Sequence, residues 1–339
     1  MNISDFDFIL PKSFIAQTPK NTRSDSKLLI MKRDGDLLIN ENFKNIDKYI
    51  SPNDLIIVND TKVIPARLYG KRKNTNGKVE ILVERILNEK NILCQIKSTR
   101  KLKINDIVII GNNIEIKFIE MLNNLAIFDT LNSTVEKLLS NHGSVPLPPY
   151  ISRFPDDMDH EFYQTIFAAK NGSVASPTAA LHFDQEVLKK IKNKKIKICN
   201  ITLHIGMGTF SPIKTKNIEN HSMHSELYYV SQDTVNHIKK CKMNNGNIIA
   251  VGTTVARALE SFYSSKNKSN VFHETNIFIK PGYNFKIVDH LITNFHLPRS
   301  SLLVMICAFY NRNKVLEAYE FAKKHNYKFF SYGDSTMII

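Results

Sequence analysis

LIIVNDTKVIPARLYG, residues 55–70, joins two different sequence patterns. Residues 54–58 form a short apolar run that ends in Asn59-Asp60-Thr61, which is typical of a buried strand leading into a polar loop. After Arg67 the pattern changes to short β-type segments with no helical periodicity between them. These segments span residues 66–72, 78–87, 91–98, 106–110, 114–121 and 125–129. The stretch therefore marks the point at which the chain enters a β-rich unit.

The β-rich unit has the features of a hairpin-connected sheet. Turn-forming residues such as those at 111–113 separate its segments, and residues 79–83 alternate in the manner of a half-buried strand. Short strands at this spacing predict a small antiparallel barrel or a sandwich. We expect a helix from Ser133 to Asn141, capped by Ser133, and then an extended linker over residues 146–150.

Outside this unit strands and helices alternate, which is typical of an α/β domain. We predict strands over residues 196–205, 226–230 and 247–251. We predict helices over residues 184–194, 231–242, 254–264, 299–310 and 313–325. Because the strand at 54–58 is of the same type, the α/β domain is predicted to be discontinuous. It comprises residues 1–65 and 150–339, with residues 66–149 inserted into it.

Composition narrows the class of protein. A chain of 339 residues exceeds the usual single core, and 42% hydrophobic with 23% charged residues is an ordinary globular balance. The longest apolar run, residues 302–309, is too short to cross a bilayer. Residues 1–5 have neither a basic start nor an apolar stretch behind them, so we expect no export signal. The four cysteines are scattered, which disfavours a disulfide framework and a structural zinc site. We expect a cytoplasmic protein without membrane contact.

The net charge of +14 favours polyanionic partners such as nucleic acid. Only 10 of the 46 basic residues are arginine, so much of the excess consists of lysines that can be ordinary solvated surface. A planar, bidentate contact cannot be kept by lysine. Arg67, Arg153, Arg257 and Arg299 are therefore the better candidates for specific polar contacts.

Residues 173–183 carry the first candidate site. Ser176 followed by Pro177 fits a helix N-cap with proline at the first helical position, which would gather backbone N–H groups and the Thr178 hydroxyl at one helix start. Such a start can bind an anion or a polar ligand, and His182 follows about one turn later. The alternative is two ordinary caps, at Ser176 and Asp184, with a hydrogen-bonded histidine between them.

A strand over 197–205 that runs into Gly206-Met-Gly208-Thr209 is the second candidate. The two glycines allow a close backbone approach to a ligand. As a dinucleotide-binding pattern the stretch is weak, because a third glycine is missing and no helix opens there.

The third candidate, HSMHSE at residues 221–226, has three possible metal ligands in six residues. No local set of carboxylates or cysteines completes a closed zinc site. A neutral His224 beside Glu226 would also suit proton transfer, and the plain alternative is a histidine pair bonded to loop backbone.

The strongest single grouping is IIAVGTTVAR at residues 248–257. A β-branched strand turns at Gly252, so that Thr253 and Thr254 would face a ligand beyond its carboxyl end, and Arg257 follows in the first helical turn. A structural arginine is the alternative. The loop at 291–300 adds Asn294 and His296 ahead of an apolar helix.

Taken together, these segments resemble the S-adenosylmethionine:tRNA ribosyltransferase-isomerase family of queuosine biosynthesis. The similar stretches follow the family order: DFDFILPKSFIAQTP (5–19), LIIVNDTKVIPARLYG (55–70), GKVEIL (77–82), PLPPYI (146–151), YQTIFA (163–168), GSVASPTAALHF (172–183), TLHIGMGTF (202–210), HSMHSE (221–226), AVGTTVARALES (250–261), LITNFHLPRSSLL (291–303) and FFSYGD (329–334). The chain departs from the family pattern at Ala180, where glycine is usual, in its lack of tryptophan and at residues 97–106.

The resemblance implies a large mixed α/β domain with an inserted small antiparallel β-barrel. It also implies a reaction that transfers the ribosyl part of S-adenosylmethionine to 7-aminomethyl-7-deazaguanine at the wobble position of tRNA. The product is epoxyqueuosine in tRNA, and adenine and methionine are released. S-adenosylmethionine is a consumed cosubstrate, no metal is required, and we expect a monomer.

The sulfonium acidifies the ribose C5′ hydrogens, so the reaction needs one group that takes a proton and one that assists the departing adenine. The sequence leaves the choice open among the candidates for these roles, which are His182, His204, His221, His224 and Glu226. The predicted substrate-binding residues are Asp60, Arg67, Ser176, Thr178, Gly206, Thr209, Gly252, Thr253, Thr254, Arg257, Asn294 and His296. Two other readings stay open: a basic RNA-binding protein without catalysis, and a metal-dependent hydrolase built on His221 and His224.

Overall fold

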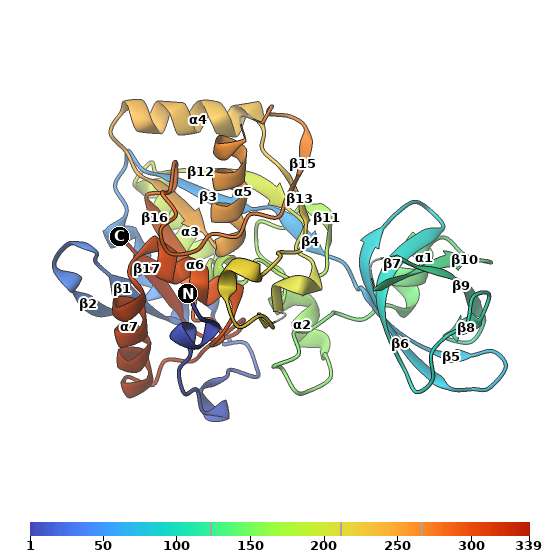
Figure 1. The fold of residues 1–339 in the computed structure, drawn as a ribbon. Coiled ribbons are helices and arrows are strands. Elements are labelled where there is room, and N and C mark those ends of the chain that lie inside the picture. Colours follow the sequence, from blue (N-terminus) through green and yellow to red (C-terminus); the bar gives the residue numbers. More distant parts are fainter. Residues whose placement is uncertain (123, 211, 266) are drawn as a thin grey trace.

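The computed structural model describes residues 1–122, 124–210, 212–265 and 267–339. It shows a mixed α/β body built on a nine-stranded sheet and a closed six-stranded barrel that stands to one side of it (Figure 1). The barrel is inserted between β4 (Thr61–Val63) and β11 (Lys170–Ser173), which pair in parallel where the chain leaves and re-enters the body. The α/β class and the antiparallel barrel are confirmed, and the sandwich alternative is wrong.

The centre of the large sheet is parallel. β3 (Leu55–Asn59) lies between β12 (Lys197–Leu203) and β14 (Ile248–Val251), and β16 (His290–Asn294) continues beside β14 in the same direction. Every residue of β3 is buried because both faces of the sheet are covered. Leu55 and Ile57 enter one core cluster, and Ile56 and Val58 enter the other.

Antiparallel pairs extend the sheet on both sides. Beyond β12 lie β13 (Glu226–Tyr229) and β15 (Phe272–Thr275). Beyond β16 lies β17 (Ser335–Ile338), which pairs in parallel with β1 (Lys27–Met31), and β1 forms a hairpin with β2 (Leu38–Asn42). The predictions above do not include β1, β2, β15, β16 or β17.

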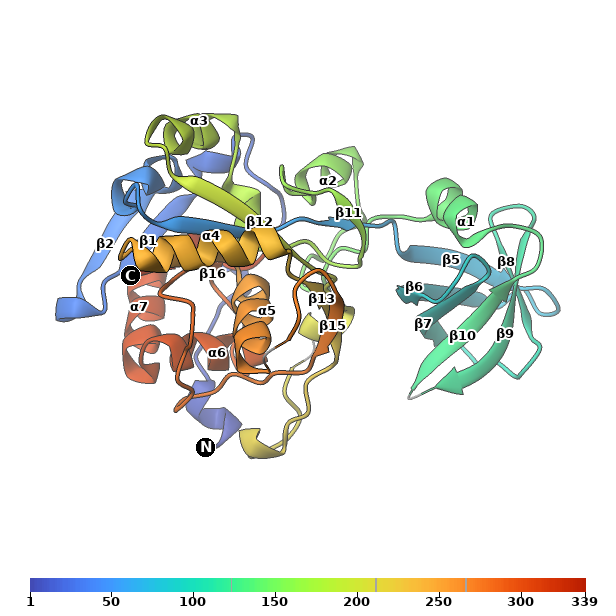
Figure 2. The same cartoon turned by 90° about the horizontal axis from the view of Figure 1, so that it is seen from above.

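The helices divide between the two faces of the sheet (Figure 2). One core cluster takes its apolar side chains from α4 (Gln232–Met243), α5 (Thr253–Ser264), α6 (Ser301–Phe309) and α7 (Arg312–Lys324). The opposite cluster receives Val187 and Ile191 of α3 (Gln185–Asn193). A short helix, α2 (Asp157–Phe162), precedes β11. In the described part of the chain, no helix is both long and apolar enough to cross a membrane.

The barrel has a core of its own. Its strands are β5 (Arg67–Arg72), β6 (Lys78–Ile86), β7 (Asn91–Ser98), β8 (Ile107–Ile110), β9 (Ile114–Leu122) and β10 (Leu125–Thr130). They close in the order β10-β7-β6-β5-β8-β9, and α1 (Val135–His142) adds Val135, Leu138 and Leu139 to the core. All six strands and α1 fall within residues 66–149, and the division into two domains at these boundaries stays a prediction.

One predicted cap of the barrel helix is wrong. Helix α1 begins after Thr134, whose hydroxyl accepts from the backbone N–H of Lys137 at 3.3 Å. Ser133, the predicted cap, instead donates its hydroxyl to the Thr134 carbonyl. A threonine at this position caps the helix as a serine would, so the pattern was correct and its register was off by one residue.

Candidate active site

A cavity of about 280 Å³ opens beyond the carboxyl ends of β12, β14 and β16. Parallel strands bring these ends to one edge of the sheet, which is where α/β folds bind ligands. The walls are mainly apolar, with contributions from Ile205, Phe295 and Phe330. The polar and glycine positions of the wall that were predicted from sequence are Ser176, Thr178, Thr209, Gly252, Thr253, Thr254, Asn294 and His296.

Two hydroxyls of the wall are unpaired within the part of the chain that the structure describes. Ser176 Oγ and Thr254 Oγ1 are buried and have no hydrogen-bond partner among the described residues. Thr254 follows Gly252, whose φ of 96° favours glycine and lets the chain turn directly from β14 into α5. A buried hydroxyl without a partner costs about 1–3 kcal/mol, so a polar ligand that bonds to these groups would recover that cost.

The expectation that Ser176 caps a helix is wrong. Pro177 occupies the N-cap position of a short 3₁₀ helix, Thr178–His182, and no side chain bonds to the free N–H groups there. The ψ of 77° at Pro177 is not helical, so the helix starts one residue later than predicted. Ser176 consequently lies outside the helix and in the cavity wall. The second predicted cap is confirmed, because Asp184 accepts from the Val187 N–H at 3.0 Å.

A chain of hydrogen bonds joins the cavity to a buried histidine. Thr178 Oγ1 donates to Asn294 Oδ1 at 2.9 Å, and Asn294 Nδ2 lies 3.0 Å from His182 Nε2 and 3.2 Å from the Phe330 carbonyl. Because a carbonyl can only accept, Nδ2 is the end of the amide that faces both groups. His182 Nε2 is then an acceptor, and the neutral ring carries its proton on Nδ1.

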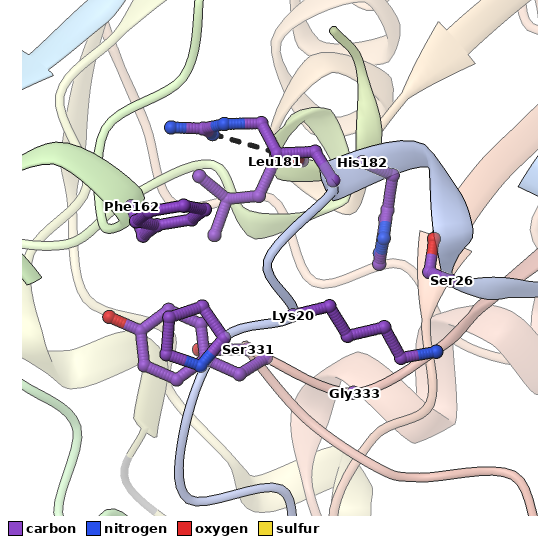
Figure 3. A pocket seen from close by; sticks show the side chains of 10 residues that line it. Lys20, Ser26, Phe162, Leu181, His182, Ser331 and Gly333 are labelled. Atoms are coloured by element: carbon purple, nitrogen blue, oxygen red, sulfur yellow. Dashed lines mark hydrogen bonds between the residues drawn. The ribbon is translucent and has the colours of Figure 1, made fainter. Parts of the chain in front are cut away.

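His182 itself lies behind the main cavity. It lines a second, smaller cavity of about 30 Å³, where its ring points toward Lys20 beside Ser26, with Phe162 at the far end (Figure 3). Burial lowers the pKa of His182 to about 4, so the ring is neutral at pH 7. The neutral His182 ring is therefore connected to the main cavity through the Asn294 amide.

A buried ion pair stands next to the cavity. Arg257 of α5 pairs through Nη1 with Glu226 Oε2, and both side chains are only 4% exposed. Thr209 Oγ1 donates to Glu226 Oε1 at 3.0 Å, which connects the pair to the cavity wall. The charge of Arg257 is thus balanced within the protein, although its Nη2 has no partner among the described residues.

Comparison with known proteins identifies the family to which the chain belongs. Residues 3–338 match the family described as "Queuosine biosynthesis protein". The chain belongs to this queuosine biosynthesis protein family. It is 45% identical over 339 residues to the S-adenosylmethionine:tRNA ribosyltransferase-isomerase of Sulfurihydrogenibium sp., with all of both chains covered. It is 49% identical over 342 residues to that of Vesicomyosocius okutanii, covering 100% of this chain and 98% of the relative.

A solved structure agrees with the sequence relatives. The crystal structure of S-adenosylmethionine tRNA ribosyltransferase from Thermotoga maritima superposes with a TM-score of 0.58 at 29% identity, covering 99% of this chain and 100% of that one. This member of the queuosine biosynthesis protein family is therefore an enzyme of the ribosyltransferase-isomerase group.

A second histidine, which is half-buried, lies in the main cavity of this family member. His296 lies in the wall, and its Nε2 is 2.8 Å from Thr293 Oγ1. Its backbone N–H donates to the Tyr319 hydroxyl at 3.1 Å, which holds the loop after β16 against α7. Burial lowers the pKa of His296 to about 3, so this ring is also neutral at pH 7.

The other candidate histidines lie outside the cavity wall. His204 Nδ1 is 2.8 Å from Thr61 Oγ1, and burial lowers the pKa of His204. His224 is exposed, and its ring rests on the backbone of Gly208, where an added Cβ would come within 2.3 Å of it. Among the described residues, one group of three possible metal ligands lies close together, Cys199 with Asp233 and His237, so His221 and His224 do not form such a group with Glu226.

Asp60 and Arg67 bond to other residues of the protein and do not line the cavity. Asp60 accepts from Thr202 Oγ1 at 2.6 Å and from Asn200, which ties the end of β3 to β12. Arg67 pairs with Glu80 on the neighbouring barrel strand and donates to the Leu147 carbonyl at 3.2 Å. Arg153 and Arg299 are likewise paired, with Asp159 and Asp7. Their predicted contacts with substrate stay predictions.

Sequence reasoning missed several residues of the site. Tyr150, Phe330 and Ser331 line the cavity, and Tyr150 Oη lies 2.6 Å from Ser331 Oγ. Glu84 of the barrel also reaches the loop after β12, where Gly206 was predicted to bind substrate. The stretches PLPPYI and FFSYGD contain the first three of these residues, but no periodicity in either stretch indicates a site.

Proposed function

We propose that this protein transfers and isomerises the ribosyl moiety of S-adenosylmethionine onto 7-aminomethyl-7-deazaguanine at the wobble position of tRNA. The product is epoxyqueuosine-tRNA, and adenine and methionine are released. The observation that carries the proposal is the cavity at the sheet edge. Its apolar walls meet the neutral ring of His296 and the hydroxyls of Ser176 and Thr254, which have no partner in the described part of the chain. An adenosyl group joined to methionine through a sulfonium needs this mixture of apolar surface and a few polar contacts.

The proposed chemistry needs a base at the ribose C5′ and an acid near adenine. The pKa of His296 is lowered to about 3, which makes this neutral ring a weak base, so His296 is suited to the substrate-binding role predicted for it. Glu226 connects to the cavity through Thr209, and His182 through Asn294. His204 and His224 would need to approach a bound substrate to act. The catalytic roles of His182, His204, His224 and Glu226 are all proposals.

The remaining parts of the proposal concern partners. S-adenosylmethionine is consumed as a ribosyl donor, and the reaction as written moves protons and breaks C–N and C–S bonds without a redox step or a metal. The tRNA carries the acceptor amine, and the net charge of +14 supports contact with its phosphates. We propose a cytoplasmic monomer.

One experiment separates the three readings of the sequence. The protein is incubated with labelled S-adenosylmethionine and tRNA that carries the deazaguanine precursor, with and without a chelator, and the tRNA nucleosides are examined by mass spectrometry. Adenine release that matches an epoxycyclopentane-bearing nucleoside supports the proposal. Binding of tRNA without turnover would support an RNA-binding module, and loss of turnover with chelator would support a metal enzyme.

A further inference from the structure

The loop after β12 is held by the barrel. Met207 N–H donates to Glu84 Oε2 at 3.0 Å, and Glu84 lies on barrel strand β6. The Met207 side chain is 8% exposed and belongs to the hydrophobic cluster of the barrel, together with Val83. This loop of the α/β body thus receives both a hydrogen bond and apolar packing from the inserted unit.

A second hydrogen bond within the barrel orients the Glu84 carboxylate. Its other oxygen, Oε1, accepts from Gln95 Nε2 on the adjacent strand β7 at 2.5 Å. A Cβ added at Gly206 would lie 3.2 Å from Glu84 Oε2, and one added at Gly208 would lie 2.3 Å from the His224 ring. The backbone of the loop therefore passes closely between the Glu84 carboxylate and His224, and small residues at 206 and 208 permit this.

The loop carries a wall residue of the cavity. Thr209, two residues after Met207, lines the cavity and donates to Glu226, which pairs with Arg257. We propose that Glu84 is a positioning residue of the barrel that fixes Thr209 in the cavity wall by holding the Met207 N–H. The barrel is then a structural part of the active site in addition to any contact it makes with tRNA. The effect on turnover rests on the proposed function, whereas the effect on the loop does not.

Hydrogen–deuterium exchange of the peptide that contains Met207 tests the positioning directly. In Glu84→Ala this amide loses its acceptor, and we expect its exchange to be faster by about 10-fold or more. Glu84→Gln should restore the slow exchange, because the amide oxygen accepts from Met207 while the Gln95 amide turns to accept from the new NH₂ group. Glu115→Ala is the matched control, because Glu115 is a barrel carboxylate on β9 that pairs with Lys73.

Turnover gives the second readout. With Glu84→Ala we expect kcat for adenine release to fall by about 10- to 100-fold, while Glu84→Gln and Glu115→Ala stay close to the unsubstituted protein. Equal exchange at Met207 in the alanine variant and the unsubstituted protein would overturn the proposal, as would a glutamine variant as defective as alanine. If the alanine variant does not fold, Glu84→Asp carries the same test, since it keeps the charge but withdraws the carboxylate. If the unsubstituted protein releases no adenine, the proposed function fails while the exchange result still decides the role of Glu84.

Discussion

At the scale of single residues, the Glu226–Arg257 pair makes the sharpest prediction. Replacing Arg257 by alanine leaves the Glu226 carboxylate buried and without its counter-charge. We expect the free energy of unfolding to fall by about 3–5 kcal/mol, measured by urea denaturation at pH 7. Arg299→Ala is the control, because its ion pair with Asp7 is solvent-exposed and should cost about 1 kcal/mol or less. Similar losses in both variants would contradict the assigned burial of the pair.

The neutral histidines predict a pH dependence of stability. The pKa of His182 is about 4 in the folded protein, whereas an unfolded histidine titrates near its ordinary value of about 6.5. Between these values the unfolded chain binds more protons, so the stabilising contribution is present above about pH 6.5 and is lost as the pH falls toward 4. The slope from this residue approaches about 1.4 kcal/mol per pH unit.

Urea unfolding at several pH values between about 4.5 and about 7 measures this slope. His182→Gln keeps an acceptor for Asn294 and removes the titrating ring, so its stability should fall less steeply on acidification than that of the unsubstituted protein. His296, whose pKa is lowered to about 3, contributes in the same direction and remains in the variant as an internal reference. Identical slopes would show that His182 is not held neutral by burial.

At the scale of elements, the 3₁₀ helix Thr178–His182 and strand β16 share the Thr178–Asn294–His182 chain. Thr178→Val keeps the side-chain shape but leaves Asn294 Oδ1 without its donor. We expect kcat/KM for adenine release to fall by about 10-fold or more, because the amide then loses its fixed orientation in the wall. Thr178→Ser keeps the hydroxyl and should retain most of the activity. If the valine variant is as active as the serine variant, the Thr178–Asn294–His182 hydrogen bonds do not contribute to catalysis.

At the scale of the whole molecule, the net charge of +14 predicts how tRNA binding responds to salt. If about six phosphates are neutralised, raising the salt concentration from about 50 to about 200 mM should weaken binding by roughly 10³-fold. Fluorescence anisotropy with labelled tRNA measures the dependence. A nearly flat response would mean that the 36 lysines are mostly solvated surface and that binding depends on a few specific contacts.

The sequence alone determined the features that depend on neighbouring residues. Alternating apolar residues and turn-forming asparagines and glycines predicted the barrel strands to within one or two residues, because hairpin strands pair with their sequence neighbours. The strand–glycine–helix pattern at 248–257 likewise predicted a turn at Gly252 that faces the cavity. Both patterns are local, so no distant segment was needed to read them.

Only the tertiary structure decided the features that depend on distant segments. Strand β1 forms a local hairpin with β2, but its other edge pairs with β17, about three hundred residues away, and Leu29 and Met31 are buried in a cluster built mainly from later segments. Arg257 was predicted to face a ligand, yet the fold places Glu226 of β13 against it. The hydrogen bond from Met207 to Glu84 and the lowered pKa values of His182 and His296 also depend on distant segments. The segments that pack around a residue determine its burial and its hydrogen-bond partners.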